Sequence, residues 1–356
     1  MKLSLSFNSI LLCLGTLLYP NSIKAQSASD FASISILKED LNLLAEGYLN
    51  PALTSLNQGM NTTWVSSAKT HELLGFDIRI GSSLVLIPSI DHNFTPDGLQ
   101  YFQVPTSTLP TISGTSSVTR LRLSIPSTSG YDPITTDLDF PGGLGTTLPI
   151  QAIPIPFAQI GLGIIPNTDI LVRWVPNSTR DDVSLGLLGI GVKHRLSQYF
   201  GIPRISPYQF AILAAYSKAH ASKKFIDSEQ IDDLTLSFGS KSDPSSLGFE
   251  TESKTIQFIG SIDLPMLTIY SRLGHLDGTS SFLAKGNYKV TYQGKVNDQL
   301  ISYESVITNP VHLSMDTKTY FASVGATLKV LFLHFYGDYT VSKNNSVNVG
   351  IALSFR

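Results

Sequence analysis

The sequence predicts an all-β fold, a closed antiparallel transmembrane β-barrel of about 12–14 strands with a short N-terminal helical plug. Three features predict it: an export-type N-terminus, apolar residues that alternate with polar ones, and turns that alternate between short and long. Only 15% of the residues are charged, compared with roughly 25% in ordinary soluble domains. Low charge without a long apolar run is typical of a barrel, because its lipid-facing residues occupy alternate positions.

Residues 1–25 are predicted to be a signal peptide. Lys2 gives a positive start, an apolar run follows from Leu3 to Leu18, and Ala25 is a small residue suited to cleavage. Ile23 is larger than ideal two positions before Ala25, so the cleavage site itself is left open. A lipoprotein is the alternative, but the residue before the only cysteine is too large for that type of cleavage. We therefore expect export to the cell outer membrane.

Charge and cysteine content exclude several classes of function. Cys13 is the only cysteine, so an exported mature chain would have no disulfide and no thiolate catalyst. Lys2 and Lys24 would leave with the signal peptide, so 25 basic residues become 23 against 27 acidic ones, a net charge of −4. Nucleic acid is not expected as a partner, because binding phosphates requires a basic surface.

Residues 26–66 are expected to form a helical segment that acts as a plug. Apolar residues recur at helical spacing from Asp30 to Leu44, and Gly47 is predicted to end this helix. A second short helix is predicted from Pro51 to Gln58, with the proline in its first turn. Helices of this length cannot span a membrane, so they either pack inside the barrel or lie in the periplasm.

Residues 67–356 are predicted to form the barrel. Clear alternation covers residues 74–80, 256–262, 267–273, 320–328 and 333–341. Runs of about nine to eleven residues are long enough for a tilted strand to cross the hydrocarbon layer. Weaker candidates are Leu84–Ile87, Leu121–Ile125, Ile155–Ile164, Asp169–Val175, Val183–Val192, Tyr208–Lys218, Tyr288–Gln293 and Leu300–Ile307.

The connections are predicted to alternate between short periplasmic turns and long external loops. The predicted short turns are Gly81–Ser82, Pro166–Asn167, Leu264–Pro265 and Lys329–Leu331. The predicted long loops are Asp91–Leu148, Lys218–Glu252 and Leu276–Thr317. An even number of strands is expected, because both ends of the barrel should then lie on the periplasmic side.

The C-terminal segment is the strongest single strand. Five apolar residues from Val347 to Phe355 alternate strictly with small or polar ones and end in an aromatic. This pattern resembles the signal by which outer-membrane proteins are recognised for insertion, although Arg356 follows the aromatic. The alternative is the closing edge strand of a secreted sandwich.

No pattern of catalytic or metal-binding residues stands out. The seven histidines form no HExxH pair, and no GxSxG elbow or phosphate-binding glycine loop is present. We therefore expect no enzymatic activity, no metal and no cofactor. A barrel lipase with a serine and a histidine on adjacent strands is kept as the least favoured hypothesis.

Polar residues within the predicted strands are expected to face the lumen. A charge that faces lipid costs about 2–4 kcal/mol for Arg or Lys near the midplane, so these side chains should point inward. The expected lumen-facing residues are Asp77, Arg79, Arg173, Arg272, His334 and Asp338. They would line either a pore or a filled, charged interior. Trp64 and Trp174 are expected in the interfacial aromatic girdles.

The run Tyr48-Leu49-Asn50-Pro51-Ala52-Leu53 resembles the Asn-Pro-Ala signature of the long-chain fatty-acid transporter family of outer-membrane proteins. The resemblance implies a barrel of about fourteen strands, a helical plug inside it, and hydrophobic substrates that bind near the plug. It places a ligand and plug region at Asn50, Pro51 and Ala52, with the helix residues Phe31, Leu37 and Leu41 beside it. The chain also looks like uncharacterised Bacteroidetes-type barrels, whose signal peptides often end in Lys-Ala-Gln.

Passive uptake of small hydrophobic or amphipathic compounds is therefore the leading functional hypothesis. The alternative is a structural or surface-docking barrel that transports nothing. The expected partners are outer-membrane lipid, a small hydrophobic ligand, and the barrel-assembly machinery during insertion.

Overall fold

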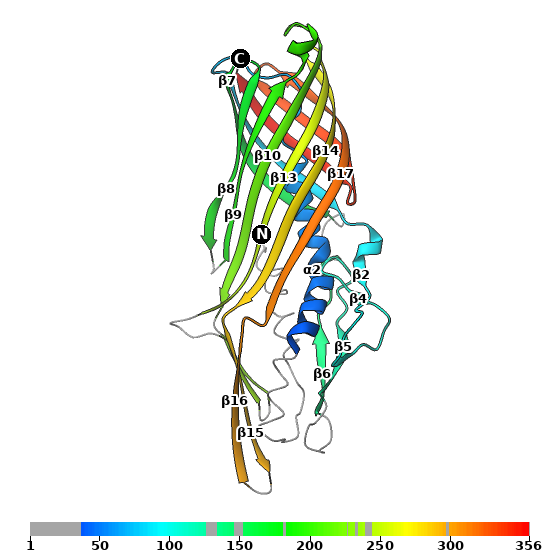
Figure 1. Ribbon diagram of the computed structural model, residues 1–356, viewed down its shortest axis with the longest axis vertical. Coiled ribbons are helices and arrows are strands. Elements are labelled where there is room, and N and C mark those ends of the chain that lie inside the picture. The colour runs from blue at the N-terminus through cyan, green and yellow to red at the C-terminus, as the bar shows by residue number, and fades with distance from the viewer. Residues whose placement is uncertain are drawn as a thin grey trace.

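The computed structural model describes residues 37–125, 134–145, 152–180, 183–225, 227–231, 234–238, 244–296 and 299–355. The predicted signal peptide and Arg356 lie outside this range. The main feature is a closed antiparallel barrel (Figure 1), which confirms the predicted fold class. Its strands, in order around the wall, are β1 (Phe76–Leu86), β19 (Ser346–Phe355), β18 (Leu333–Val341), β17 (Val311–Val330), β14 (Leu267–Lys285), β13 (Ser245–Asp263), β10 (Tyr208–Phe225), β9 (Val183–Arg195), β8 (Thr168–Arg180) and β7 (Ala152–Ile165).

The first and last strands close the barrel. β1 pairs with β19 from Phe76 opposite Phe355 to Val85 opposite Ser346, and on its other side it pairs with β7. The rings of Phe76 and Phe355 stack with centroids 5.2 Å apart. The predicted C-terminal strand is therefore the closing strand of a barrel, and no free sandwich edge is left along it.

The barrel has ten strands, so the predicted number of 12–14 is wrong. The candidates at 121–125, 288–293 and 300–307 are strands, but they lie in small sheets beside the barrel. β5 (Thr119–Ile125) pairs with β3 (Phe102–Gln103) and β6 (Ile134–Phe140), while β15 (Asn287–Val296) and β16 (Gln299–Thr308) join β11 (Asp227–Ile231) and β12 (Leu234–Phe238). Alternation identifies a strand with two different faces, but it does not say which sheet the strand joins.

The predicted turn at Gly81–Ser82 is also wrong, because β1 continues through it. Gly81 lies on the inward face, and a Cβ there would come 2.6 Å from the Tyr336 hydroxyl and 2.9 Å from Phe157 Cζ. This glycine makes room for aromatic side chains in the lumen. The other predicted short turns, around Asn167, Pro265 and Leu331, do connect neighbouring strands.

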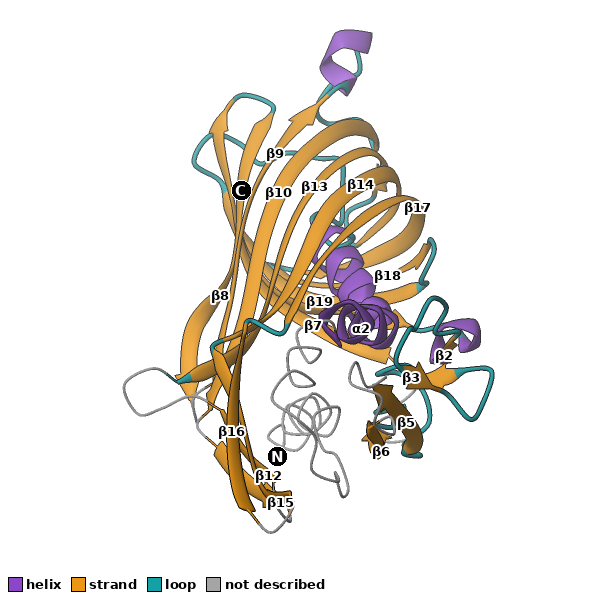
Figure 2. Cartoon of the chain, turned by 60° about the horizontal axis from the view of Figure 1, so that its bottom comes forward, coloured by secondary structure: helices purple, strands orange, loops and turns teal. Residues whose placement is uncertain are grey.

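The wall has unequal height around the barrel. β13, β14 and β17 contain 19, 19 and 20 residues, whereas β18, β19 and β1 contain 9, 10 and 11. Much of the predicted loops 218–252 and 276–317 therefore consists of strand. The long strands extend the wall on one side as an open half-cylinder toward the long-loop end (Figures 1 and 2).

A single helix, α2 (Leu37–Asn61), occupies this half-cylinder and continues into the closed ring (Figure 2). The two predicted helices are thus one, with Pro51 in its interior. Gly47 does not end the helix, which continues through it. Its missing side chain makes room for the ring of Phe94, whose Cδ2 would lie 2.1 Å from an added Cβ. An interior proline costs about 3 kcal/mol or more, so tertiary packing must offset the break in the hydrogen-bond ladder.

That packing is a large apolar cluster at the long-loop end. Leu41, Leu44 and Tyr48 of the helix meet Leu247, Phe282 and Leu313 of the long strands. On the other side they meet a side lobe made of the small sheets β2–β4 and β3–β5–β6, where β2 is Asn93–Phe94 and β4 is Leu109–Pro110. Asp40 ties the helix to this lobe by accepting backbone N–H groups of Gln100 (3.0 Å) and Tyr101 (2.8 Å).

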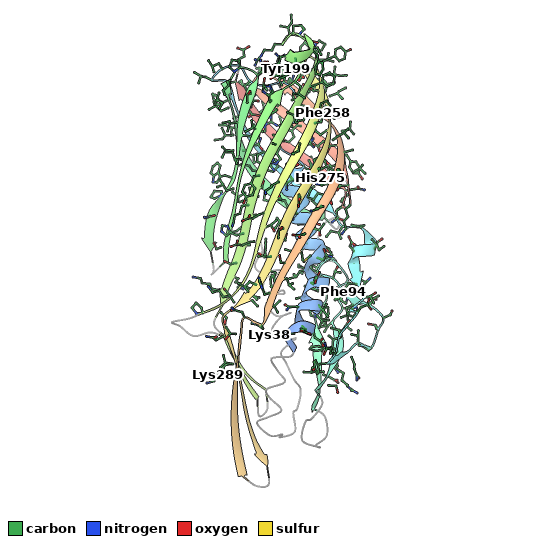
Figure 3. The ribbon with its side chains drawn as sticks, in the orientation of Figure 1. Lys38, Phe94, Tyr199, Phe258, His275 and Lys289 are labelled. Carbon is green, nitrogen blue, oxygen red and sulfur yellow. The ribbon has the colours of Figure 1, made fainter. Side chains whose placement is uncertain are left out.

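The outer face of the barrel is apolar near the short turns and charged farther away. Along β10 the outward residues run from Tyr208 through Phe210 and Ile212 to Tyr216, and Lys218 follows. Other strands show the same order, with Phe258 and Ile256 before Lys254, and Leu273 before Asp277. Figure 3 shows Phe258 on the outer wall of the barrel. Among the described residues, no helix is long and apolar enough to cross a bilayer.

Candidate functional site

The interior of the barrel is occupied by the chain itself. After α2 ends at Asn61, the chain leaves helical geometry and runs through the ring to the short-turn end, where β1 begins at Phe76. We call residues 57–71 the lumen segment. Trp64, Val65 and Ala68 of this segment are buried against Leu171, Leu213 and Ile259 of the wall. The lumen segment therefore connects the two ends of the barrel.

Because most of the lumen segment is not helical, its backbone carbonyls need other hydrogen-bond donors. Inward-facing wall side chains supply them. The donations are Arg173 Nη1 to Met60 O (2.7 Å), Gln257 Nε2 to Asn61 O (2.7 Å), Arg272 Nη1 to Thr62 O, Gln159 Nε2 to Trp64 O (2.9 Å), Thr327 Oγ1 to Ser66 O (3.3 Å) and Lys193 Nζ to Lys69 O (2.8 Å). The wall thus holds the lumen segment at positions along most of its length.

Arg272 and Asp338 form the charged centre of this interior. Arg272 Nη2 lies 2.6 Å from Asp338 Oδ1, and both side chains are almost fully buried. Asp338 also accepts hydrogen bonds from the Tyr270 hydroxyl (2.9 Å) and from Asn348 Nδ2 (2.6 Å). A buried ion pair needs partners for its remaining polar atoms. Tyr270 and Asn348 supply donors to the carboxylate, whereas Arg272 Nε has no hydrogen-bond partner among the described residues.

Arg173 is held by aromatic rings instead of a carboxylate. Its guanidinium carbon lies 4.3 Å from the ring centroid of Trp64 and 4.1 Å from that of Phe157. Gln159 Oε1 accepts from Arg173 Nη2 at 3.0 Å. Desolvated cation–π contacts contribute about 2 kcal/mol or more. Trp64 is fully buried in this stack, so its predicted place in an interfacial girdle is wrong, whereas Trp174 is exposed on the outer face.

Two further clusters lie toward the short-turn end. Arg79 forms a close ion pair with Asp77 and donates to Ser66 Oγ at 3.1 Å. Asp169 accepts from the His71 backbone N–H (2.9 Å), lies 3.1 Å from His71 Nδ1, and pairs with Lys193 Nζ at 2.9 Å. These contacts fix the end of the lumen segment just before the chain enters the wall.

The six residues expected in the lumen all lie on inward-facing positions of their strands. Asp77, Arg79, Arg173, Arg272 and Asp338 are buried, and His334 is half-buried beside a cavity at the short-turn end. Gln159, Gln257 and Asn348 were not predicted as lumen residues, although each occupies an inward position between outward apolar neighbours. Their signal was the alternation itself, which places neutral polar residues in the lumen as well as charged ones.

The region expected to bind a ligand is part of a packed helix. Phe31 and the side chain of Leu37 lie outside the described residues. Leu41 is buried in the apolar cluster, which Ala52 also touches. Asn50 is exposed and accepts a hydrogen bond from Thr54 Oγ1 (3.0 Å), while Pro51 is buried. Within the described part of the chain, no group of three or more His, Cys, Asp or Glu residues is arranged to hold a metal.

Comparisons with known proteins give a family and a set of distant barrels. The family of unknown function DUF6588 matches residues 1–355. No curated protein matches. Similar solved structures include the translocator domain of the autotransporter NalP from Neisseria meningitidis (8% identity, TM-score 0.30, covering 93% of this chain and 100% of that one).

A second is the outer membrane protease OmpT from Escherichia coli (10% identity, TM-score 0.32, covering 81% of this chain and 100% of that one). A third is a BenF-like porin from Pseudomonas fluorescens Pf-5 (12% identity, TM-score 0.15, covering 79% of this chain and 98% of that one). These likenesses are too low to assign an activity, and the barrel is defined by its own strand pairing.

Proposed function

Because the chain belongs to the family of unknown function DUF6588, we propose a role from its geometry. The protein is an outer-membrane barrel that its own N-terminal segment keeps closed, and it serves as a platform that presents its long-loop end outside the cell. The single observation that carries this proposal is the set of hydrogen bonds from the wall to the backbone of the lumen segment.

The apolar belt supports a membrane location. From Tyr208 to Tyr216 the outward face of β10 carries no charged residue. At about 3.3 Å per residue this is roughly 26 Å of strand, and a tilt of about 40° reduces it to roughly 20 Å along the membrane normal. That height approaches the apolar band of about 25 Å found in outer-membrane barrels. The charged outward residues beyond the belt, such as Lys218 and Glu252, would then lie in water.

The contacts of the lumen segment support a closed barrel. A hydrogen bond contributes about 0.5–1.5 kcal/mol net, or about 1.5–3 kcal/mol when one partner is charged. Of the six donations, three come from charged side chains, so withdrawing the segment would cost on the order of 5–10 kcal/mol before any apolar contact is counted. An open pore would therefore be a rare state of the isolated protein.

The long-loop end supplies the surface for a platform. The side lobe, the first half of α2 and the tall part of β13, β14 and β17 pack into one apolar cluster. Such a packed structure holds a fixed shape, as a surface that binds partners requires. Its outer positions include Arg120 and Arg122, which pair with Asp139 and Asp137.

Passive uptake of small hydrophobic compounds is the second candidate, and the incomplete wall favours it. β17 pairs with β18 only from Ala322 to Val330, so its first half has no strand neighbour on that side. The apolar half of α2 lies beside this gap, and Leu43 on it is 39% exposed. A hydrophobic compound could reach the helix there without displacing the lumen segment.

Surface labelling tests the proposal. Arg120→Cys places a thiol on the side lobe, and Tyr199→Cys places one at the short-turn end, where Figure 3 marks Tyr199. In intact cells, a maleimide too large for porins should label the first variant and should label the second only after lysis. The unsubstituted protein is the control for Cys13. Labelling of Tyr199→Cys in intact cells, or of neither variant, would contradict the proposed orientation.

An uptake assay separates the two candidates. Cells with and without the gene should accumulate a hydrophobic dye equally if the protein is a platform. Accumulation that depends on the gene and is lost with Leu43→Asp would favour uptake. Lys318→Ala, which changes an exposed residue on the outer face of β17, is the matched control.

A further inference from the structure

A polar cavity opens at the short-turn end of the lumen, away from the apolar cluster. Its volume is about 220 Å³, and it lies between the end of the lumen segment and the wall. Five cationic side chains line it: Lys69, Arg79, Lys193, Arg204 and Lys329. Only two acidic residues do so, Glu72 and Asp263. The cavity therefore differs in charge from the balanced interior above it.

Three of the five cations already have carboxylate partners. Arg79 pairs with Asp77, Lys193 with Asp169, and Lys329 with Asp263 at 3.5 Å. Their charges are neutralised locally and provide no net attraction for a ligand. The remaining two cations decide what the cavity can bind.

Lys69 and Arg204 have no carboxylate partner among the described residues. Lys69 is exposed, and the Arg204 guanidinium donates to the Thr70 carbonyl at 2.8 Å.

The balance at this mouth is therefore positive. Two lining cations without a carboxylate partner among the described residues, Lys69 and Arg204, stand against one lining acid, Glu72. An anion bound at this cavity would be attracted by both side chains. Arginine is well suited to this role because its planar fork matches the geometry of phosphate and carboxylate oxygens.

Hydroxyl groups complete the lining. Ser67, Thr70, Thr268 and Ser354 surround the cavity. Ser67 and Thr268 donate to the Asp263 carboxylate, so the hydroxyls of Thr70 and Ser354 are the ones that can donate to an oxyanion. Thr70 is buried, and its Oγ1 has no hydrogen-bond partner among the described residues. The volume is below the roughly 300–1,000 Å³ of pockets for drug-sized ligands, so the site suits a small group.

We propose that this cavity is a binding site for a phosphate group, held by Arg204 and Lys69 together with the hydroxyls of Thr70 and Ser354. The site faces the short-turn side, where both free phosphate and the headgroups of anionic phospholipid would be within reach. It does not depend on whether the protein is a platform or an uptake channel.

Binding of inorganic phosphate to the purified full chain in an uncharged detergent tests the proposal. The measurement is the melting temperature as phosphate is added, compared with chloride at equal ionic strength. Wild type should show a saturable rise with phosphate. In the double variant Lys69→Gln/Arg204→Gln the apparent Kd should increase at least about ten-fold, since two charged donors are lost. The control Lys218→Gln/Lys318→Gln removes the same charge from the outer face of the wall, away from the cavity, and should bind as wild type does.

Arg204 also holds the Thr70 carbonyl, so the single variant Lys69→Gln separates binding from folding. It should melt as wild type does without phosphate, and still bind phosphate several-fold more weakly. No saturable effect in wild type, or equal affinity in the double variant and its control, would overturn the proposal.

A lipid arm identifies the source of the phosphate group. Phosphatidylglycerol is added to the micelles at a low mole fraction. If it competes with inorganic phosphate in wild type and not in the double variant, the site takes a lipid headgroup. If it does not compete while phosphate still binds, the site takes free phosphate; both outcomes support a phosphate site.

Discussion

Arg272 and Asp338 show what individual residues contribute to this barrel. Each carries a charge that would be unstable in the interior alone, and each is neutralised by the other at 2.6 Å. Arg272 also binds the Thr62 carbonyl of the lumen segment, so the same side chain joins β14, β18 and the plug. Removing one partner of a buried pair is costly because the other is left unpaired.

The variant Arg272→Met should therefore destabilise the protein strongly. It keeps a long side chain but leaves the Asp338 carboxylate buried without its cation, at a cost of about 3–5 kcal/mol. Lys318→Met is the control, because its exposed pair with Asp277 spans 3.7 Å and such pairs contribute less than about 1 kcal/mol. Urea unfolding of both variants in micelles measures the difference. Similar free energies of unfolding for the two would contradict a central role of the buried pair.

Residue positions in the lumen followed from the sequence wherever charge made them conspicuous. Asp77, Arg173 and Arg272 could be placed inward because lipid would not tolerate them. The position of Trp64 could not be foreseen, since a tryptophan suits a membrane interface as well as a stack on arginine. Its neighbours from Asn61 to Ala68 show no alternation that would place them inside a barrel.

At the scale of elements, the strands were easier to predict than their partners. The closing strand β19 was predicted from strict alternation, and it pairs in full with β1. β5, β15 and β16 alternate too, yet they lie in small sheets, because alternation reports two unlike faces and not what covers them. The single helix across Gly47 and Pro51 was missed because local helix-stop signals are weaker than the packing of Leu41, Leu44 and Leu53.

The end of that helix provides a prediction about the plug. Asn61 Nδ2 contacts the hydroxyl of Ser253 on β13, and both side chains are buried. The pair Asn61→Cys/Ser253→Cys should therefore form a disulfide on mild oxidation of the folded protein. The cross-link would be detected from the mass of the peptides released by protease. Asn61→Cys/Lys318→Cys is the control, because Lys318 points out of the barrel; equal cross-linking of both pairs would contradict an ordered plug.

At the scale of the whole molecule, ten strands enclose an interior that one segment of the same chain fills. The wall is complete only toward the short turns, where the outer face is apolar, and it opens into a half-cylinder where the outer face is charged. The alternation of short and long connections predicted this polarity. Strand lengths on the long-loop side could not be predicted, because strands beyond the membrane carry polar residues on their outer face, as loops do.

Single-channel recording in a planar lipid bilayer shows whether the lumen segment closes the barrel. The full chain, inserted without denaturant, should show no steady ion conductance, because the wall holds the segment through Arg173, Gln257 and Arg272. A stable ohmic conductance in the unmodified protein would show that the lumen segment does not close the barrel.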